Sequence, residues 1–151
     1  MKLSGANRRC RRDEGSSLVE FSLVAFMSVM VLLAVVEMGR LVLVYTAVSN
    51  AAHVGTRYAI VHGNDRTGSG IDGPSGPGST TQVETVVKNF AAAGLLDTSR
   101  LTVTVTYPDG SNAAGKNVSV AVTYPYDPLI GYFSPALSVT LGSTSQGIIT
   151  F

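Results

Sequence analysis

The chain is poor in the residues from which disulfide frameworks, metal sites and catalytic clusters are usually built. Among 151 residues it has one cysteine, two histidines and no tryptophan, and only 14% of its residues are charged. The lone Cys10 excludes an internal disulfide, and neither His53 nor His62 has a cysteine or a paired acid at metal-ligand spacing. No glycine-rich phosphate loop opens a helix. We therefore expect a protein that is not an enzyme, with no metal, no cofactor and no small-molecule substrate.

Proline and charge are both missing from one long stretch. No proline occurs in residues 17–61, and no charged residue lies between Glu20 and Glu37. The sixteen uncharged residues 21–36 form about 24 Å of helix at 1.5 Å per residue. Flanking apolar residues bring this length near the ~30 Å of a bilayer core. The sequence predicts one transmembrane helix over residues 16–40.

Positive charge is concentrated before this apolar stretch. Five of the eleven basic residues precede it, namely Lys2, Arg8, Arg9, Arg11 and Arg12. Basic residues beside a membrane helix favour the cytoplasmic side, so residues 1–15 are predicted to form a basic cytoplasmic leader and the rest to be exported. The remainder of the chain has more acids than bases, which leaves no basic patch for nucleic acid.

A cleavable secretory signal is the competing interpretation of the same pattern, because a basic stretch precedes an apolar one. The apolar part is long for such a signal, and the residues after it continue as a helix without a clear small-residue cleavage site. We favour a membrane span over removal by ordinary signal peptidase.

The helical pattern continues beyond the span as an amphipathic stalk over residues 41–62. On a helical wheel, apolar and small residues share one stripe and polar residues lie opposite. The stripe comprises Leu41, Val44, Tyr45, Val48, Ala51, Ala52, Gly55 and Ala59, and the opposite side comprises Thr46, Asn50, His53 and Arg57. The stripe packs on the chain's own domain, or else the small residues Ala47, Ala51 and Gly55, spaced by four, allow helix packing with another helix.

The remaining residues predict a small exported domain over residues 81–151. Residues 63–80 are rich in glycine, proline and serine, which indicates a loop. A second helix should begin with Thr81 and Glu84 at capping-box spacing and stop at Gly94. Alternating apolar and polar residues then predict a hairpin of two strands, followed by one or two further strands. The fold class is α+β, with a long N-terminal helix (transmembrane, then stalk) and a short second helix packed on a small antiparallel sheet.

One acid interrupts the apolar region near its start. Glu20 follows Leu18 and Val19 and precedes Phe21. An ionised side chain in a membrane helix costs roughly 2.5 to 3.5 kcal/mol at the bilayer centre and less near its surface. Glu20 therefore either has a specific partner or lies at the interface with its carboxylate among the lipid headgroups.

The segment GSSLVEF, from Gly15 to Phe21, has a glycine and, after four intervening residues, a glutamate and an aromatic residue. With a basic leader before it and an apolar helix after it, the segment resembles the prepilin processing signature of type IV pilin-like proteins. More narrowly, GSSLVEFSLV, VVEMGRLVLVYTAVSNAAHVGTRYA and VSVAVTYPYDPLI resemble the TadE-like family, which comprises pseudopilins of the tight adherence (Tad) pilus machinery. The resemblance is strongest over residues 15–61.

This resemblance implies specific roles for the residues at the start of the helix. A prepilin peptidase would cut on the cytoplasmic side between Gly15 and Ser16, making Glu20 the fifth residue of the mature chain. Glu20, with Phe21 beside it, would serve assembly and recognition, its carboxylate neutralising the new α-amino group of Ser16 on a neighbouring subunit. Two opposite charges in a poorly solvated zone compensate each other's desolvation better than either stands alone.

The resemblance also implies the partners and the location of the chain. The partners are the membrane, the prepilin peptidase, other pilins and pseudopilins, and the Tad assembly platform proteins. The location is the bacterial inner membrane, with the N-terminus in the cytoplasm and the C-terminal domain periplasmic or extracellular. The alternative hypothesis is an unprocessed bitopic membrane protein whose exported domain binds a partner.

Overall fold

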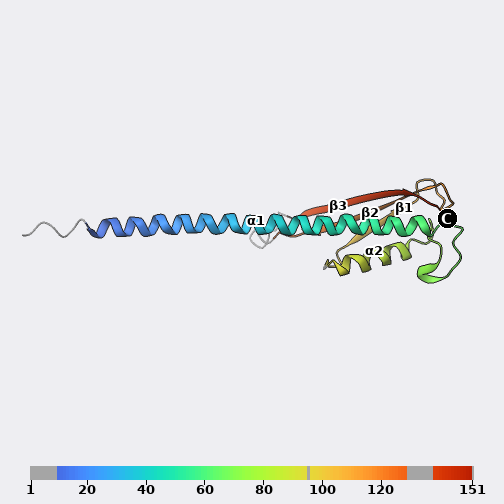
Figure 1. Cartoon of the computed structure of the whole chain (residues 1–151), viewed down its shortest axis with the longest axis horizontal. Coiled ribbons are helices and arrows are strands. Elements are labelled where there is room, and N and C mark those ends of the chain that lie inside the picture. The colour runs from blue at the N-terminus through green and yellow to red at the C-terminus, as the bar shows by residue number, and fades with distance from the viewer. Residues whose placement is uncertain (1–9, 95, 129–137, 151) are drawn as a thin grey trace, which may run out of the picture. The chain divides into compact units, whose positions relative to one another are not determined.

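The computed structural model describes residues 10–94, 96–128 and 138–150. Its elements, in chain order, are helix α1 (Cys10–Val61), the 3-10 turn η1 (Gly70–Asp72), helix α2 (Thr81–Ala93) and strands β1 (Thr102–Thr106), β2 (Asn117–Tyr126) and β3 (Val139–Ile148) (Figure 1). This order confirms the predicted α+β class. The first nine residues of the predicted leader lie outside the described residues.

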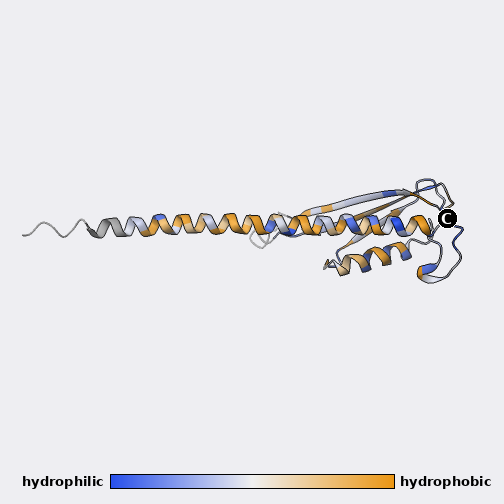
Figure 2. Ribbon diagram, in the orientation of Figure 1, coloured by the Kyte–Doolittle hydropathy of each residue, from blue (hydrophilic) through white to orange (hydrophobic). Residues whose placement is uncertain are grey.

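The chain divides into two compact units between Gly39 and Arg40, and α1 contributes residues to both. In the first unit the described part of the chain is helical throughout. Its large apolar side chains, from Leu18 to Met38, are 47–71% exposed, and Figure 2 shows the apolar residues recurring along this part of α1. By length and composition the helix qualifies to cross a membrane, and none of its apolar window is buried within the described residues.

The second unit is built around a three-stranded antiparallel sheet in the order β1-β2-β3. Val103 pairs with Val122 across the first two strands, and Val120 pairs with Ser145 across the second two. The central strand β2 buries Val118, Val120 and Val122 completely. These valines form one core with residues of α1 and α2, namely Val48, Ala51, Ala52, Ala59, Val83, Val87 and Ala91. Both helices therefore cover the same face of the sheet.

The amphipathic pattern of the stalk is largely confirmed. The polar residues Thr46, Asn50, His53 and Arg57 are exposed, and the small residues of the opposite stripe are buried in the core. Tyr45 is the exception, because its side chain is 50% exposed although the wheel placed it in the stripe. At 100° per residue Tyr45 lies at the margin of a stripe centred on Val48 and Ala51, and the domain does not reach that far around the helix.

Helix α2 differs from its prediction at the cap. The helix begins at Thr81 and its N-cap is Thr80, so the capping box proposed for Thr81 and Glu84 is wrong. The Thr80 hydroxyl instead donates to the Glu84 carboxylate at 2.9 Å. The predicted stop at Gly94 is confirmed as the C-cap, and the Gly94 N–H bonds the carbonyls of Phe90 and Ala92.

The strand alternation is confirmed, and it makes one sheet face polar. On β1 the residues Thr102, Thr104 and Thr106 are exposed, whereas the flanking Leu101 and Tyr107 are buried. Among the described residues after Tyr126 only β3 forms a strand, so the possible fourth strand is not among them.

Candidate functional site

The residues of the predicted processing signature all lie on α1. Gly15, Ser16, Glu20 and Phe21 are exposed, and a Cβ added at Gly15 would meet nothing within 4 Å. Ser16 and Glu20 are four residues apart, which places them on the same side of the helix. The predicted processing segment is therefore exposed, and its glycine is not required by packing within the described chain.

Glu20 lies in a part of the chain that contains no positive side chain. Residues 15–39 include no lysine, arginine or histidine, so a counter-charge for Glu20 cannot come from this segment's side chains. Nearby hydroxyls are satisfied locally: Ser22 donates to the Val19 carbonyl and Ser28 to the Val24 carbonyl, each at 2.8 Å. Such bonds satisfy the serine hydroxyls with backbone carbonyls of the same helix, so that these hydroxyls need no partner in a lipid environment. Glu20 is thus the residue of this turn that most needs an outside partner.

The predicted helix-packing residues lie against the chain's own domain. A Cβ added at Gly55 would stand 2.5 Å from Val87 Cγ2 of α2 and 3.1 Å from Val120 Cγ1 of β2. Ala51 is completely buried, and Ala47 Cβ comes within 3.6 Å of the Cβ position at Gly94. The helix that packs against these small residues is therefore α2. It crosses α1 so closely that only glycine fits at position 55.

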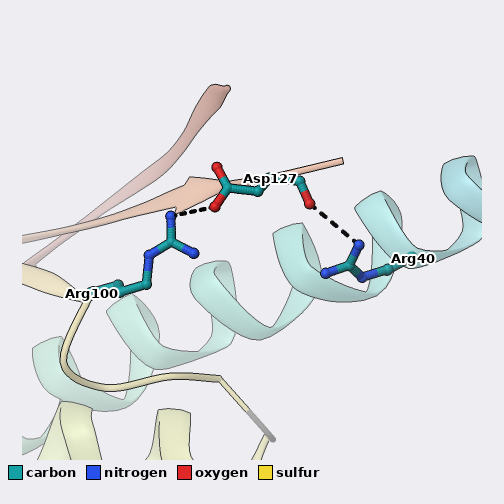
Figure 3. Close-up of polar contacts among 3 residues, drawn as sticks. All are labelled: Arg40, Arg100 and Asp127. Carbon is teal, nitrogen blue, oxygen red and sulfur yellow. Dashed lines mark hydrogen bonds and ion pairs between the residues drawn. The ribbon is translucent and has the colours of Figure 1, made fainter. Parts of the chain in front are cut away.

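A second group of polar residues, absent from the sequence prediction, lies where β2 ends. Arg40 Nη1 donates to the Asp127 carbonyl oxygen at 3.3 Å, and Arg100 Nη2 contacts Asp127 Oδ2 at 2.7 Å (Figure 3). The Arg40 guanidinium lies 5.1 Å from the centre of the Tyr126 ring, and that of Arg100 lies 5.9 Å from the Tyr124 ring. We call these five residues the basal cluster. It joins α1, the turn before β1 and the end of β2.

A third polar group fixes the loop that follows α1. Ser75 is completely buried; its N–H and its hydroxyl both donate to the His62 carbonyl, at 2.7 and 3.1 Å. The Tyr107 hydroxyl donates to Ser75 Oγ at 3.2 Å, and Asn112 Nδ2 donates to the Ser75 carbonyl at 2.9 Å. Residues 63–80, predicted as a loop, contain the 3-10 turn η1, and Ser75 anchors the middle of this segment in the core.

The two histidines take part in structural contacts. His53 Nδ1 lies 3.1 Å from Ser145 Oγ, which joins α1 to β3. The His62 ring stacks on Tyr58 with ring centres 3.9 Å apart. Among the described residues no three side chains of histidine, cysteine, aspartate or glutamate are grouped so that they could hold a metal ion.

Alkaline pH is expected to destabilise the second unit through Tyr107. Burial raises the pKa of Tyr107 above its ordinary value of 10.0, with the Ser75 hydrogen bond opposing in part. The unfolded chain therefore loses this proton at lower pH than the folded chain, and the stabilisation present below pH 10 is lost as pH rises through the folded pKa. Thermal unfolding from pH 8 to 11 should show a smaller decline in Tyr107→Phe than in the unchanged protein. The exposed Tyr45→Phe is the control, and an equal decline in all three proteins would contradict this role.

The apolar span and the domain together define a membrane-anchored, single-pass protein with an α+β domain. The family model described as TadE-like protein matches residues 15–57, which confirms the resemblance over that part of the chain. That family is structural rather than enzymatic. The match contains the whole predicted processing signature and the small residues that face α2. No curated protein and no solved structure matches the chain.

Proposed function

We propose that this chain is a minor pilin or pseudopilin of a Tad pilus, cut by a prepilin peptidase after Gly15 and assembled through its exposed apolar helix. One observation carries the proposal: within the segment that matches the TadE-like family, an exposed glycine and an exposed glutamate lie just before the uncovered apolar side chains of one continuous helix. Membrane anchoring accounts for the apolar side chains, but it does not account for Glu20.

Cleavage after Gly15 supplies the positive charge that Glu20 lacks. Residues 15–39 have no basic side chain, and cleavage creates an α-amino group on Ser16. Placed beside Glu20 of a neighbouring subunit, that amino group forms a compensated pair in a zone of poor solvation. The pair would set the axial position of one helix against the next, because only one register brings the two charges together.

The local structure suits a peptidase substrate. Gly15 is helical, and a peptidase must unwind the helix there to extend the scissile bond. Glycine disfavours a helix interior by about 1 kcal/mol relative to alanine, and it has no side chain to obstruct the peptidase. Phe21 is 71% exposed and is available to the peptidase or to a neighbouring helix.

Substitution of Gly15 tests this proposal. Gly15→Val is expected to accumulate as the uncut chain, because a β-branched side chain adds bulk at the scissile bond, while membrane insertion continues. The measurement is the mass of the protein recovered from membranes of cells that contain the prepilin peptidase. Gly39→Ala is the control, since a Cβ at Gly39 also meets nothing within 4 Å and should leave cleavage unchanged. Normal cleavage of Gly15→Val would argue against processing at this bond.

The alternative is an unprocessed bitopic protein whose exported domain recruits a partner. This alternative requires only the membrane-spanning helix and the second unit. Under it the Glu20 carboxylate lies among the lipid headgroups at the membrane surface. Under this alternative the leader stays on the mature chain, and substitution of Gly15 or Glu20 has no effect on activity.

A further inference from the structure

We propose that the outer edge of β3 is a docking site for an extended segment of another protein, which adds to the sheet as a strand and carries an acidic side chain toward α1. The site lies wholly within the Arg40–Phe151 unit. The proposal goes beyond the proposed function, because it requires neither cleavage after Gly15 nor incorporation into a pilus.

The outer edge of β3 has unpaired backbone groups. β3 is an edge strand, since the sheet order is β1-β2-β3. Just past its end the Ile149 N–H donates to the Lys116 carbonyl, so Ile149 directs its backbone groups toward β2. These directions alternate along a strand. The residues whose backbone groups point away from the sheet are therefore Thr140, Gly142, Thr144, Gln146 and Ile148. All five are exposed, and no other segment of the described chain bonds their backbone groups.

This edge lacks the features that usually keep sheet edges from pairing, namely short length, charge, proline and bulges. β3 has ten residues, none of them charged and none proline, and it pairs with β2 one residue to one without a bulge. The opposite edge, β1, has only five residues, and Pro108 follows two residues after its end. The outer edge of β3 is therefore much better suited than β1 to accept another strand.

The charge beside this edge indicates the chemistry of the partner. The residues of α1 that contact β3 are Ser49, His53, Thr56 and Ile60. At 100° per residue, Arg57 lies 40° further round the helix than His53, on the side away from the core. Arg57 is exposed and forms no ion pair within the described residues. Its guanidinium is thus available to a carboxylate on a strand added beside β3.

The position of that carboxylate follows from the alternation of side chains. An added strand would direct every second side chain toward α1, as β3 does with Ser143 and Ser145. A Cβ at Gly147 would meet side chains of Thr56 and Ile60, so Arg57 lies level with Gly147. A second copy of this chain offers no suitable acid, because neither β1 nor β3 contains one. The site therefore favours a strand of different sequence with an acid opposite Gly147.

The test uses the full, uncut chain in detergent micelles and fluorescent synthetic peptides of eight residues that alternate threonine with valine. One valine is replaced by glutamate in the first peptide and by lysine in the second. In both, the amides of the valine, glutamate or lysine residues are N-methylated, which leaves the threonine amides free to bond β3 in an antiparallel strand and prevents the peptides from pairing with one another. A third peptide has the sequence of the first but is N-methylated on the threonine amides instead. Fluorescence anisotropy measures binding.

We expect the glutamate peptide with free threonine amides to bind, and its isomer to bind at least about ten-fold more weakly, because several backbone hydrogen bonds are lost. Arg57→Glu should weaken binding of the glutamate peptide about five-fold and strengthen that of the lysine peptide, the effect of one exposed ion pair. Thr144→Pro should weaken binding about ten-fold, because proline removes an N–H from the outer edge. Lys88→Glu reverses an exposed charge on α2 and should change nothing.

Three results would overturn the proposal. The first is the absence of binding, or equal binding of the two N-methyl isomers. The second is binding that Arg57→Glu leaves unchanged, which would remove the role of the acid. The third is self-association of the chain without peptide that Thr144→Pro abolishes, which would assign the edge to a second copy. The two isomers test the edge on the unchanged protein, so the proposal stays testable if circular dichroism shows that Thr144→Pro is unfolded. Because the uncut chain is used throughout, a failure here is distinct from a failure of processing.

Discussion

Glu20→Ala is expected to reduce incorporation of the chain into the pilus machinery by on the order of 100-fold or more while leaving membrane insertion intact. Removing one partner of a poorly solvated ion pair costs about 3 to 5 kcal/mol, because the other charge is left uncompensated. In the proposed assembly that other charge is the α-amino group of Ser16 on a neighbouring subunit. Insertion itself should become easier, since alanine removes a charge from an apolar helix.

The measurement is the amount of this chain that copurifies with pilus components from cells expressing each variant at equal levels. Glu20→Gln should fail like alanine, because it keeps the size of the side chain but loses the charge, whereas Glu20→Asp should retain part of the incorporation. Ser22→Ala is the matched control in the same helical turn, since the Ser22 hydroxyl bonds only the Val19 carbonyl in the described chain. Full incorporation of Glu20→Ala would remove the assembly role assigned to this carboxylate.

Gly55→Val is expected to destabilise the second unit by about 3 kcal/mol, the upper part of the range for overpacked cores. Even a single Cβ at this position would approach Val87 to 2.5 Å, and both Val87 and Val120 are completely buried. Valine has a stiff, branched side chain, so neither it nor its neighbours can rotate away. We expect α1 to separate from α2, which exposes the apolar face of the sheet that the two helices bury.

Unfolding by denaturant in detergent micelles measures this effect, with tyrosine fluorescence as the signal because the chain has no tryptophan. Gly78→Ala is the matched control, since a Cβ at Gly78 meets nothing within 4 Å and should leave the midpoint unchanged. A Gly55→Val midpoint equal to that of the unchanged protein would mean that α1 and α2 are not as close as described.

Much of the fold follows from local patterns that a sequence displays directly. The long helix was predictable because residues 17–61 lack proline and keep a helical period beyond the apolar run. The strands were predictable because Val103 and Val105 alternate with threonines. The cap of α2 was misplaced by one residue, since Thr80 and Thr81 are adjacent and only the three-dimensional path of the incoming loop decides which of them is the N-cap.

The contacts that fix the loop and the basal cluster were not predictable, because they join residues far apart in the chain. Ser75 is one serine among many in a loop-like sequence, and its burial depends on Tyr107 and His62. Asp127 is 87 residues from Arg40, and no local pattern connects them. The small residues at 51 and 55 did indicate close packing, but the sequence alone did not decide between another subunit's helix and the chain's own α2.

The proposed processing signature was the part of the candidate site that sequence could supply, because it is a short continuous segment. The structure adds that Gly15 is exposed, and the sequence shows that residues 15–39 contain no basic side chain to pair with Glu20. Both features support the proposal that cleavage creates the partner of Glu20.

The most direct test of this account is the intact mass and N-terminal residue of the protein recovered from membranes of cells with and without the prepilin peptidase. The account predicts a chain that begins at Ser16 when the peptidase is present and an uncut chain that retains its leader when it is absent. An uncut chain beginning at Met1 in both cells would contradict it, and would favour a permanently anchored protein whose exported domain binds a partner.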